Sequence, residues 1–161
     1  MSIKSRKSNK IIFWTIILSL GLIILVFKLN QTPIEGPLKG KTAVVYRSAT
    51  CGCCANYITY LRRAGVKVEE KLTEDADEIN RQFGISEELS SCHTTIIDGY
   101  VVVGHIPVEA IQKLLAEKPA IVGIALPRMP SGSPGMPGKK FGTFDIYSFT
   151  SVNSSSPYLS L

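Results

Sequence analysis

Residues 42–54 read TAVVYRSATCGCC and combine a predicted strand with most of the chain's cysteines. The apolar and β-branched side chains of Thr42–Arg47 are typical of a short buried strand. After it come three of the four cysteines, Cys51, Cys53 and Cys54. Apolar side chains then recur at helical spacing as far as Leu61, and Gly65 suits the position after a helix C-terminus. We therefore expect a strand, a turn that carries the thiols, and a helix over residues 53–64.

The three thiols lie at the predicted N-terminus of this helix. Unpaired backbone N–H groups and the helix dipole favour anions there, which lowers the pKa of a thiol. Cys51 and Cys54 have the C-x-x-C spacing of thiol–disulfide enzymes, and Cys53 adds a further sulfur. Structural disulfides explain the set less well, because adjacent Cys53 and Cys54 cannot easily bridge each other. The cluster suits a soft metal ion, thiol–disulfide chemistry with Cys51 and Cys54 as the catalytic pair, or both.

The first thirty residues form a separate unit. Four basic residues precede an uncharged run over residues 11–27, which Lys28 closes. This run is short for a membrane-spanning helix and long for a signal-peptide core, and no small-residue cleavage site follows it. We expect residues 1–30 to be a basic end and an uncleaved transmembrane signal anchor that crosses the membrane within residues 11–29. A cleaved signal peptide is the alternative.

The charge distribution predicts the orientation of this anchor. The formal net charge is +5, and residues 1–30 hold five Lys or Arg and no acidic residue. The positive-inside rule puts such an N-terminus in the cytoplasm and the rest of the chain in the periplasm or outside the cell. The remaining residues hold 13 basic and 13 acidic side chains and no basic stripe with interleaved aromatic residues. This composition argues against a nucleic-acid partner.

The elements after the first helix alternate in a regular order. They are a strand at 66–72, a helix from Thr73 or Asp75 to Phe83, strands at 94–97 and 100–103 joined by Asp98-Gly99, and a helix from Pro107 to Pro119. The whole order is β-α-β-α-β-β-α, which predicts a thioredoxin-like α/β layer over residues 41–149. We expect a linker at 31–40, a last edge strand within 141–149, and a flexible tail at 150–161.

Further candidate ligands follow downstream. Cys92 and His93 precede a strand expected to face the N-terminus of the first helix, so Cys92 completes a pocket of four thiols and His93 adds an imidazole. His105 follows the predicted hairpin. Met129 and Met136 lie in a Pro/Gly-rich loop that can be neither helix nor central strand and can fold over the site. Thiolate and thioether are soft ligands, so we expect Cu(I), with zinc as the less favoured metal.

The chain resembles the CopG-type copper-resistance proteins, long classed as a metal-binding domain of unknown function. The resemblance covers about residues 41–149 and rests on four motifs: Cys51-Gly52-Cys53-Cys54, Ser91-Cys92-His93-Thr94, Gly104-His105-Ile106-Pro107, and Met129-Pro130 followed by Gly132-Ser133-Pro134-Gly135-Met136. It implies a thioredoxin-like fold, an extracytoplasmic location, copper bound by thiols, and interconversion of Cu(I) and Cu(II). Carried over, it implies Cys51, Cys53, Cys54 and Cys92 as ligands, with His93, His105, Met129 and Met136 as candidates. Two residues depart from the family pattern: Arg128 replaces a Gly before the first Met, and Val103 replaces an acidic residue before Gly-His.

The hypothesis from the sequence is a membrane-anchored, extracytoplasmic copper-binding protein of copper handling and resistance. One alternative is a thiol–disulfide oxidoreductase that uses Cys51 and Cys54 without metal. Another is a non-catalytic metal chaperone. The expected partners are copper ions, the membrane, and a copper exporter or another metal-handling protein.

Overall fold

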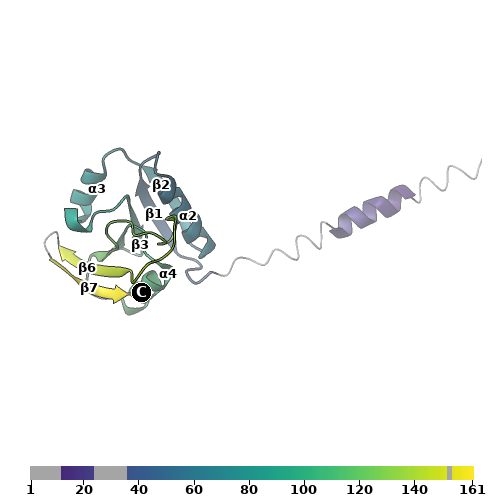
Figure 1. The fold of residues 1–161 in the computed structure, drawn as a ribbon. Coiled ribbons are helices and arrows are strands. Elements are labelled where there is room, and N and C mark those ends of the chain that lie inside the picture. The colour runs from purple at the N-terminus through teal and green to yellow at the C-terminus, as the bar shows by residue number, and fades with distance from the viewer. Residues whose placement is uncertain (1–11, 24–35, 152–153) are drawn as a thin grey trace, which may run out of the picture. The chain divides into compact units, whose positions relative to one another are not determined.

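The structure is a computed structural model that describes residues 12–23, 36–151 and 154–161 (Figure 1). The chain divides into two compact units, Met1–Pro33 and Ile34–Leu161. In the first unit, residues 12–23 are helical. Among the described residues, no helix combines the length and apolarity needed to cross a membrane. The expected anchor over residues 11–29 extends beyond this helix at both ends, and its other residues lie outside the described part of the chain.

The second unit is built on a mixed sheet of seven strands in the order β2-β1-β3-β4-β5-β6-β7. The strands are β1 (Thr42–Arg47), β2 (Lys67–Leu72), β3 (His93–Ile97), β4 (Tyr100–Val103), β5 (Gly123–Ala125), β6 (Asp145–Ser151) and β7 (Ser154–Ser160). The β1–β2 and β4–β5 pairs are parallel, and the other neighbouring pairs are antiparallel. The fold is therefore a mixed α/β fold.

The α-helices of this unit lie close to the predicted ranges, with ends that differ by one or two residues. They are α2 (Gly52–Arg63), α3 (Ala76–Phe83) and α4 (Val108–Glu117), with a short 3₁₀ helix η1 (Glu87–Leu89). A side-chain oxygen of Asp75 accepts the N–H of Glu78 at 2.8 Å and caps α3, while Gly84 ends it in the left-handed conformation with φ of 67°. The predicted order β-α-β-α-β-β-α is present, and β5, β6 and β7 extend the sheet beyond it.

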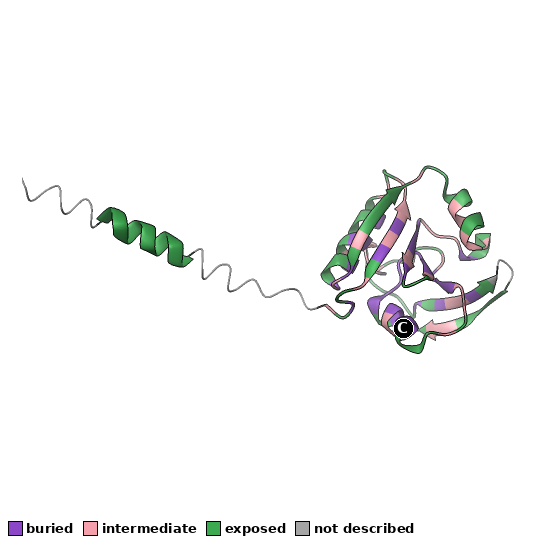
Figure 2. Ribbon diagram, turned by 180° about the vertical axis from the view of Figure 1, so that it is seen from behind, coloured by how far each residue is buried: buried purple, intermediate pink, exposed green. Residues whose placement is uncertain are grey.

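Each face of the sheet buries a separate hydrophobic cluster. Buried residues, purple in Figure 2, accordingly lie along the strands of the sheet. Side chains such as Ile58 of α2 and Leu114 of α4 pack against one face, where Val45 and Ile97 point. The other face packs Ile85 and Leu89, from the segment that follows α3, against Val101, Val103 and Phe149. Successive strand residues alternate between these clusters, as the pleat of a strand requires. Because only residues 48–51 connect β1 to α2, the N-terminus of α2 lies near the carboxyl end of β1.

The C-terminal segment corrects two expectations. Instead of a flexible tail over 150–161, the chain forms β7, which pairs with β6 from Asp145↔Ser160 to Ser151↔Ser154. The predicted last edge strand is consequently an inner strand. The serine-rich sequence offered no hydrophobic pattern from which to predict this strand. The strand forms nonetheless, because sheet hydrogen bonds use backbone groups and do not depend on side-chain hydrophobicity. The terminal residue is held as well, since Leu161 and Phe144 exchange backbone hydrogen bonds.

The end of the predicted linker is also part of the folded unit. Leu38 is 4% exposed and belongs to the core on the α2 face. Its N–H donates to the carbonyl oxygen of Ala64 at 2.8 Å. Gly36 approaches the same residue so closely that a Cβ atom there would lie 2.1 Å from the carbonyl carbon of Ala64. The folded unit therefore begins before the expected boundary at residue 41.

Candidate metal centre

The N-terminus of α2 holds three of the four cysteines in defined roles. Cys51 is the N-cap residue, with φ of −76° and ψ of 94°, and its sulfur accepts the N–H of Cys54 at 3.3 Å. Cys54 faces the core and is 0% exposed, whereas Cys51 and Cys53 are half-buried. The β1–α2 turn therefore presents two sulfurs near the surface and one beneath them.

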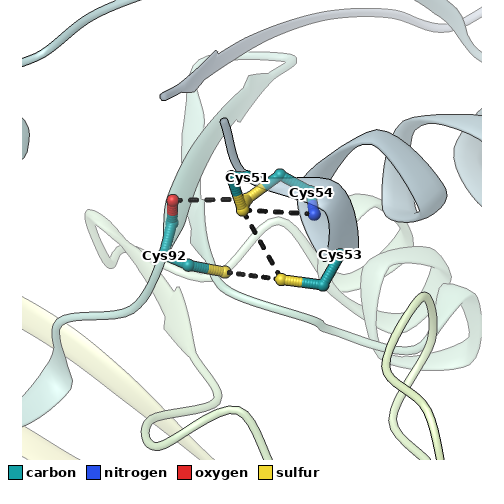
Figure 3. Close-up of side chains that lie close together, drawn as sticks. All are labelled: Cys51, Cys53, Cys54 and Cys92. Atoms are coloured by element: carbon teal, nitrogen blue, oxygen red, sulfur yellow. Dashed lines mark hydrogen bonds between the residues drawn. A yellow bond between two sulfur atoms is a disulfide. The ribbon is translucent and has the colours of Figure 1, made fainter. Parts of the chain in front are cut away.

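Four sulfur atoms gather at this point (Figure 3). Cys51 and Cys54 form a disulfide, and Cys53 and Cys92 are free. The Cys53 sulfur lies 3.5 Å from that of Cys51 and 3.9 Å from that of Cys92. The Cys54 sulfur lies 3.4 Å from the carbonyl oxygen of Cys92. All four sulfurs lie within 4.8 Å of one another, and Cys53 lies near both the disulfide and Cys92.

The pairing of β1 with β3 brings Cys92 to this cluster. These strands are antiparallel, and Arg47 at the end of β1 pairs with His93 at the start of β3. The residue before β3 therefore lies beside the turn that leads into α2. The structure thus brings Cys92 to the cysteine trio, as we expected for a thioredoxin-like layer.

Both histidines of the chain contact the sulfur of Cys92. His93 Nδ1 lies 3.3 Å from this sulfur and His105 Nε2 lies 3.1 Å from it. Nδ1 of His105 donates to the carbonyl oxygen of Pro134 at 2.6 Å, which fixes the tautomer and leaves the Nε2 lone pair towards Cys92. Cys92, His93 and His105 form a second group of possible metal ligands that shares one sulfur with the first.

The two histidines are buried, and Cys92 is half-buried. His93 is 3% exposed and His105 is 0% exposed. Burial, and then the neighbouring His105, lower the pKa of His93 from 6.5 to about 3, and burial also lowers the pKa of His105. Burial, and then the neighbouring Cys53, raise the pKa of the Cys92 thiol to about 12. Without metal the imidazoles are neutral and Cys92 is a thiol, so a bound metal ion would displace the thiol proton.

Sequence reasoning missed the role of Tyr57. Its hydroxyl donates to the carbonyl oxygen of Ile106 at 2.8 Å, and its ring centroid lies 4.6 Å from that of His93 and 5.5 Å from that of His105. Burial raises the pKa of this hydroxyl well above 10.0. The sequence indicated only an apolar helix position. The contact with both imidazoles depends on packing between α2 and the sheet.

The Pro/Gly-rich loop also reaches the centre, although mainly through its backbone. Ser133 is 1% exposed and the carbonyl of Pro134 binds His105. Gly135 lies against α2, where a Cβ atom would come within 2.7 Å of the Tyr57 nitrogen. The N–H of half-buried Met136 donates to the carbonyl oxygen of Ser133 at 2.9 Å.

The structure also places Met129 and the two residues that depart from the family pattern, Arg128 and Val103. Met129 is 38% exposed and lines a surface cavity of about 560 Å³ together with Ser91 and Glu87. Arg128 adopts a left-handed conformation with φ of 66°, which is the conformation that glycine takes most readily. Val103 is 0% exposed and packs on the α3 face of the sheet, where an apolar side chain fits.

The chain is similar to known proteins in both sequence and fold. Residues 89–136 match a family described as "Protein of unknown function, DUF411". The solved structure "Copper resistance protein copG- Form 2" is 35% identical, with a TM-score of 0.69, over 75% of this chain and 98% of that chain. The structure "Copper resistance protein copG- Form 1" is 36% identical, with a TM-score of 0.68, over 74% of this chain and 96% of that chain. No curated protein matches the chain.

Proposed function

Because this chain belongs to the CopG-type copper-resistance family, we propose that it binds copper and serves copper resistance. The observation that carries the proposal is the gathering of four cysteine sulfurs within 4.8 Å of one another. When all four are reduced, they form a compact set of soft ligands, which suits Cu(I). Zinc accepts the same ligand types, so the binding experiment must distinguish zinc from Cu(I).

We propose a thioredoxin-like class for the fold. Its core is the order β2-β1-β3-β4, with β1 and β2 parallel and β3 antiparallel to its neighbours. A C-x-x-C pair at the start of the first helix of this core supports the same assignment. The three further strands would then be an addition to that core.

Interconversion of Cu(I) and Cu(II) is the finer proposal. Cys51 and Cys54 form a disulfide, so the same two residues in their reduced dithiol form can give up two electrons. Two Cu(II) ions would take one electron each and become Cu(I), while the two thiols lose two protons and form one S–S bond. The sulfur of Cys53, 3.5 Å from that of Cys51, would remain as a ligand for the product ion.

A thiol–disulfide oxidoreductase is the second candidate, and the same disulfide favours it. The two activities differ in their substrate. Reduction of Cu(II) by the reduced chain, without reduction of a disulfide-bonded peptide, supports copper chemistry, and the reverse result supports the second candidate. Transfer of Cu(I) to an exporter domain without any change of oxidation state would indicate a chaperone.

We further propose that the chain is a single-pass membrane protein with its N-terminus in the cytoplasm. Four basic residues before the apolar run, and the exposed apolar side chains of residues 12–23, support this topology. A reporter that is active only after export, fused after Leu161, should be active. Activity of a cytoplasmic reporter at the same position would contradict the topology.

Anaerobic titration of the reduced chain with Cu(I) against a competing chelator tests the copper proposal. Cys51→Ser combined with Cys53→Ser should weaken binding strongly. Cys92→Ser should weaken it by at least tenfold, or about 1.4 kcal/mol, because one ligand of a small site is lost. Unchanged affinity in both variants would refute binding by these thiols, and a preference for zinc over Cu(I) would refute the choice of metal.

A further inference from the structure

The disulfide removes ligands from one of the two groups of possible metal ligands and leaves the other group intact. It consumes the sulfurs of Cys51 and Cys54, and with them two members of the four-thiol group. The second group, Cys92, His93 and His105, contains neither of these residues, so it is complete in the disulfide form. We propose that the disulfide form holds its own metal site, made of Cys92, His93 and His105, which takes Cu(II). This inference rests on the proposed copper function.

The distances suit a single metal ion. The Cys92 sulfur lies 3.3 Å from His93 Nδ1 and 3.1 Å from His105 Nε2. Two ligands on one tetrahedral ion, with bonds of about 2.3 Å to sulfur and about 2.0 Å to nitrogen, are separated by roughly 3.5 Å. Small rotations of the side chains therefore bring all three atoms to bonding distance. Ring packing between the two histidines, with centroids 4.8 Å apart, limits other arrangements.

The hydrogen bonds of the histidines point to the same role. His105 gives its Nδ1 proton to the Pro134 carbonyl, so its free lone pair is directed at Cys92. His93 is 3% exposed, and its Nε2 atom has no hydrogen-bond partner among the described residues. An unpaired polar atom in the core is costly, and an apolar residue would fill a purely structural position better. The use of Nδ1 as a ligand explains why an imidazole is kept there.

The ligand chemistry selects the oxidation state. One thiolate with two imidazoles is the set that mononuclear copper sites use for electron transfer, and imidazole suits Cu(II) better than an all-sulfur set does. The reduced centre, with four thiols, suits Cu(I). Cys92 belongs to both groups, so the Cu(I) site of the reduced centre and the Cu(II) site of the disulfide form would share one ligand.

The residue content of the chain makes the proposal testable without variants. The chain has only two histidines and four cysteines, and all six are in this centre. The full chain, without an affinity tag, is purified in detergent with its disulfide formed and loaded with one equivalent of Cu(II) under argon. The electron paramagnetic resonance spectrum should show coupling to two imidazole nitrogens, and a thiolate-to-Cu(II) absorption band should appear. A spectrum without nitrogen coupling would overturn the proposal.

Substitutions then test each ligand with Co(II), which thiols do not reduce. In the variant Cys51→Ser/Cys53→Ser/Cys54→Ser, Cys92 is the only thiol, and one equivalent of Co(II) should bind with a thiolate-to-metal band. Adding Cys92→Ser should remove the band and weaken binding at least tenfold, as should His105→Ala. Glu87→Gln, on the surface, is the control for non-specific carboxylate binding and should change nothing. Equal affinity with and without Cys92 would refute the site.

These results separate the inference from the proposed function. If the reduced chain binds Cu(I) but the disulfide form binds neither Co(II) nor Cu(II), the second site is refuted and copper binding stands. If the reduced chain fails to bind Cu(I), the proposed function is refuted, whatever the disulfide form binds.

Discussion

His105 donates from Nδ1 to the carbonyl oxygen of Pro134 at 2.6 Å, and these residues are 29 positions apart in the chain. The bond joins the connection between β4 and α4 to the Pro/Gly-rich loop. It sets the tautomer of the imidazole and directs the other nitrogen at the sulfur of Cys92. The loop therefore contributes to the centre through a backbone carbonyl, in addition to any role of its methionines.

The close approach of Gly135 to α2 predicts that Gly135→Ala will disturb the centre. A Cβ atom there would lie 2.7 Å from the Tyr57 nitrogen and 3.0 Å from the Cys53 carbonyl oxygen, at a φ of +84°. The loop must move, and the Pro134 carbonyl moves with it. We expect Gly135→Ala to lower both the free energy of unfolding, measured by urea titration, and the affinity for Co(II).

Gly142→Ala is the matched control for this substitution. Gly142 has a φ of +69° and no heavy atom within 4 Å of the added Cβ, so it shares the backbone strain without the contact. Its cost should be limited to about 1–2 kcal/mol, with unchanged Co(II) affinity. Equal losses in the two variants would show that the approach to α2 is unimportant.

The left-handed backbone of Arg128 predicts that glycine is better at this position. With φ of 66°, any residue that has a Cβ atom is strained there. Arg128→Gly should stabilise the chain by up to about 1 kcal/mol, because the strain removed exceeds the entropic cost of glycine only slightly. Arg128→Ala removes the same charge and keeps the strain, so it should give no gain. Identical unfolding free energies for the two variants would contradict the assignment of strain.

The buried imidazole of His93 predicts a pH dependence of stability in the metal-free chain. Its pKa falls from 6.5 to about 3 on folding, so between these values the unfolded chain binds a proton that the folded chain does not. The full stability is present above pH 6.5 and declines as the pH falls towards 3, by an amount on the order of a few kcal/mol. The measurement is the free energy of unfolding at several pH values.

His93→Asn is the comparison for this dependence, because asparagine is polar and does not titrate. The substitution can lower stability at every pH, but the slope against pH should become smaller. His105, whose pKa burial also lowers, supplies the slope that remains. A slope identical to that of the unaltered chain would show that His93 is protonated in the folded state.

We predict that replacing Met129 and Met136 changes the binding or oxidation of Cu(I) more than it changes the free energy of unfolding. Leucine preserves volume and apolarity but removes the thioether, so Met129→Leu with Met136→Leu should change stability by under about 1.5 kcal/mol. The 38% exposure of Met129 supports this small effect. The affinity for Cu(I) or the rate of Cu(I) oxidation should fall. Normal copper binding and turnover, together with a much lower melting temperature, would identify both methionines as packing residues.

Local interactions explain why much of the fold could be predicted. Asp75 and Gly84 bound α3 through short-range hydrogen bonds and a left-handed turn. Asp98 and Gly99 turn the β3–β4 hairpin with φ values of 48° and 84°. The cysteines at a strand-to-helix junction likewise follow from neighbouring residues. Each of these signals lies within a few positions of the structure that it specifies, so the sequence alone determined them.

Other features depend on contacts between distant segments, which tertiary structure decided. The β1–β3 register brings Cys92 to the sulfurs of α2, and the β6–β7 pairing orders a serine-rich end. Spacing along the chain restricts these contacts without selecting one. They form because burying both faces of the sheet leaves a single arrangement that satisfies the backbone and fills the core.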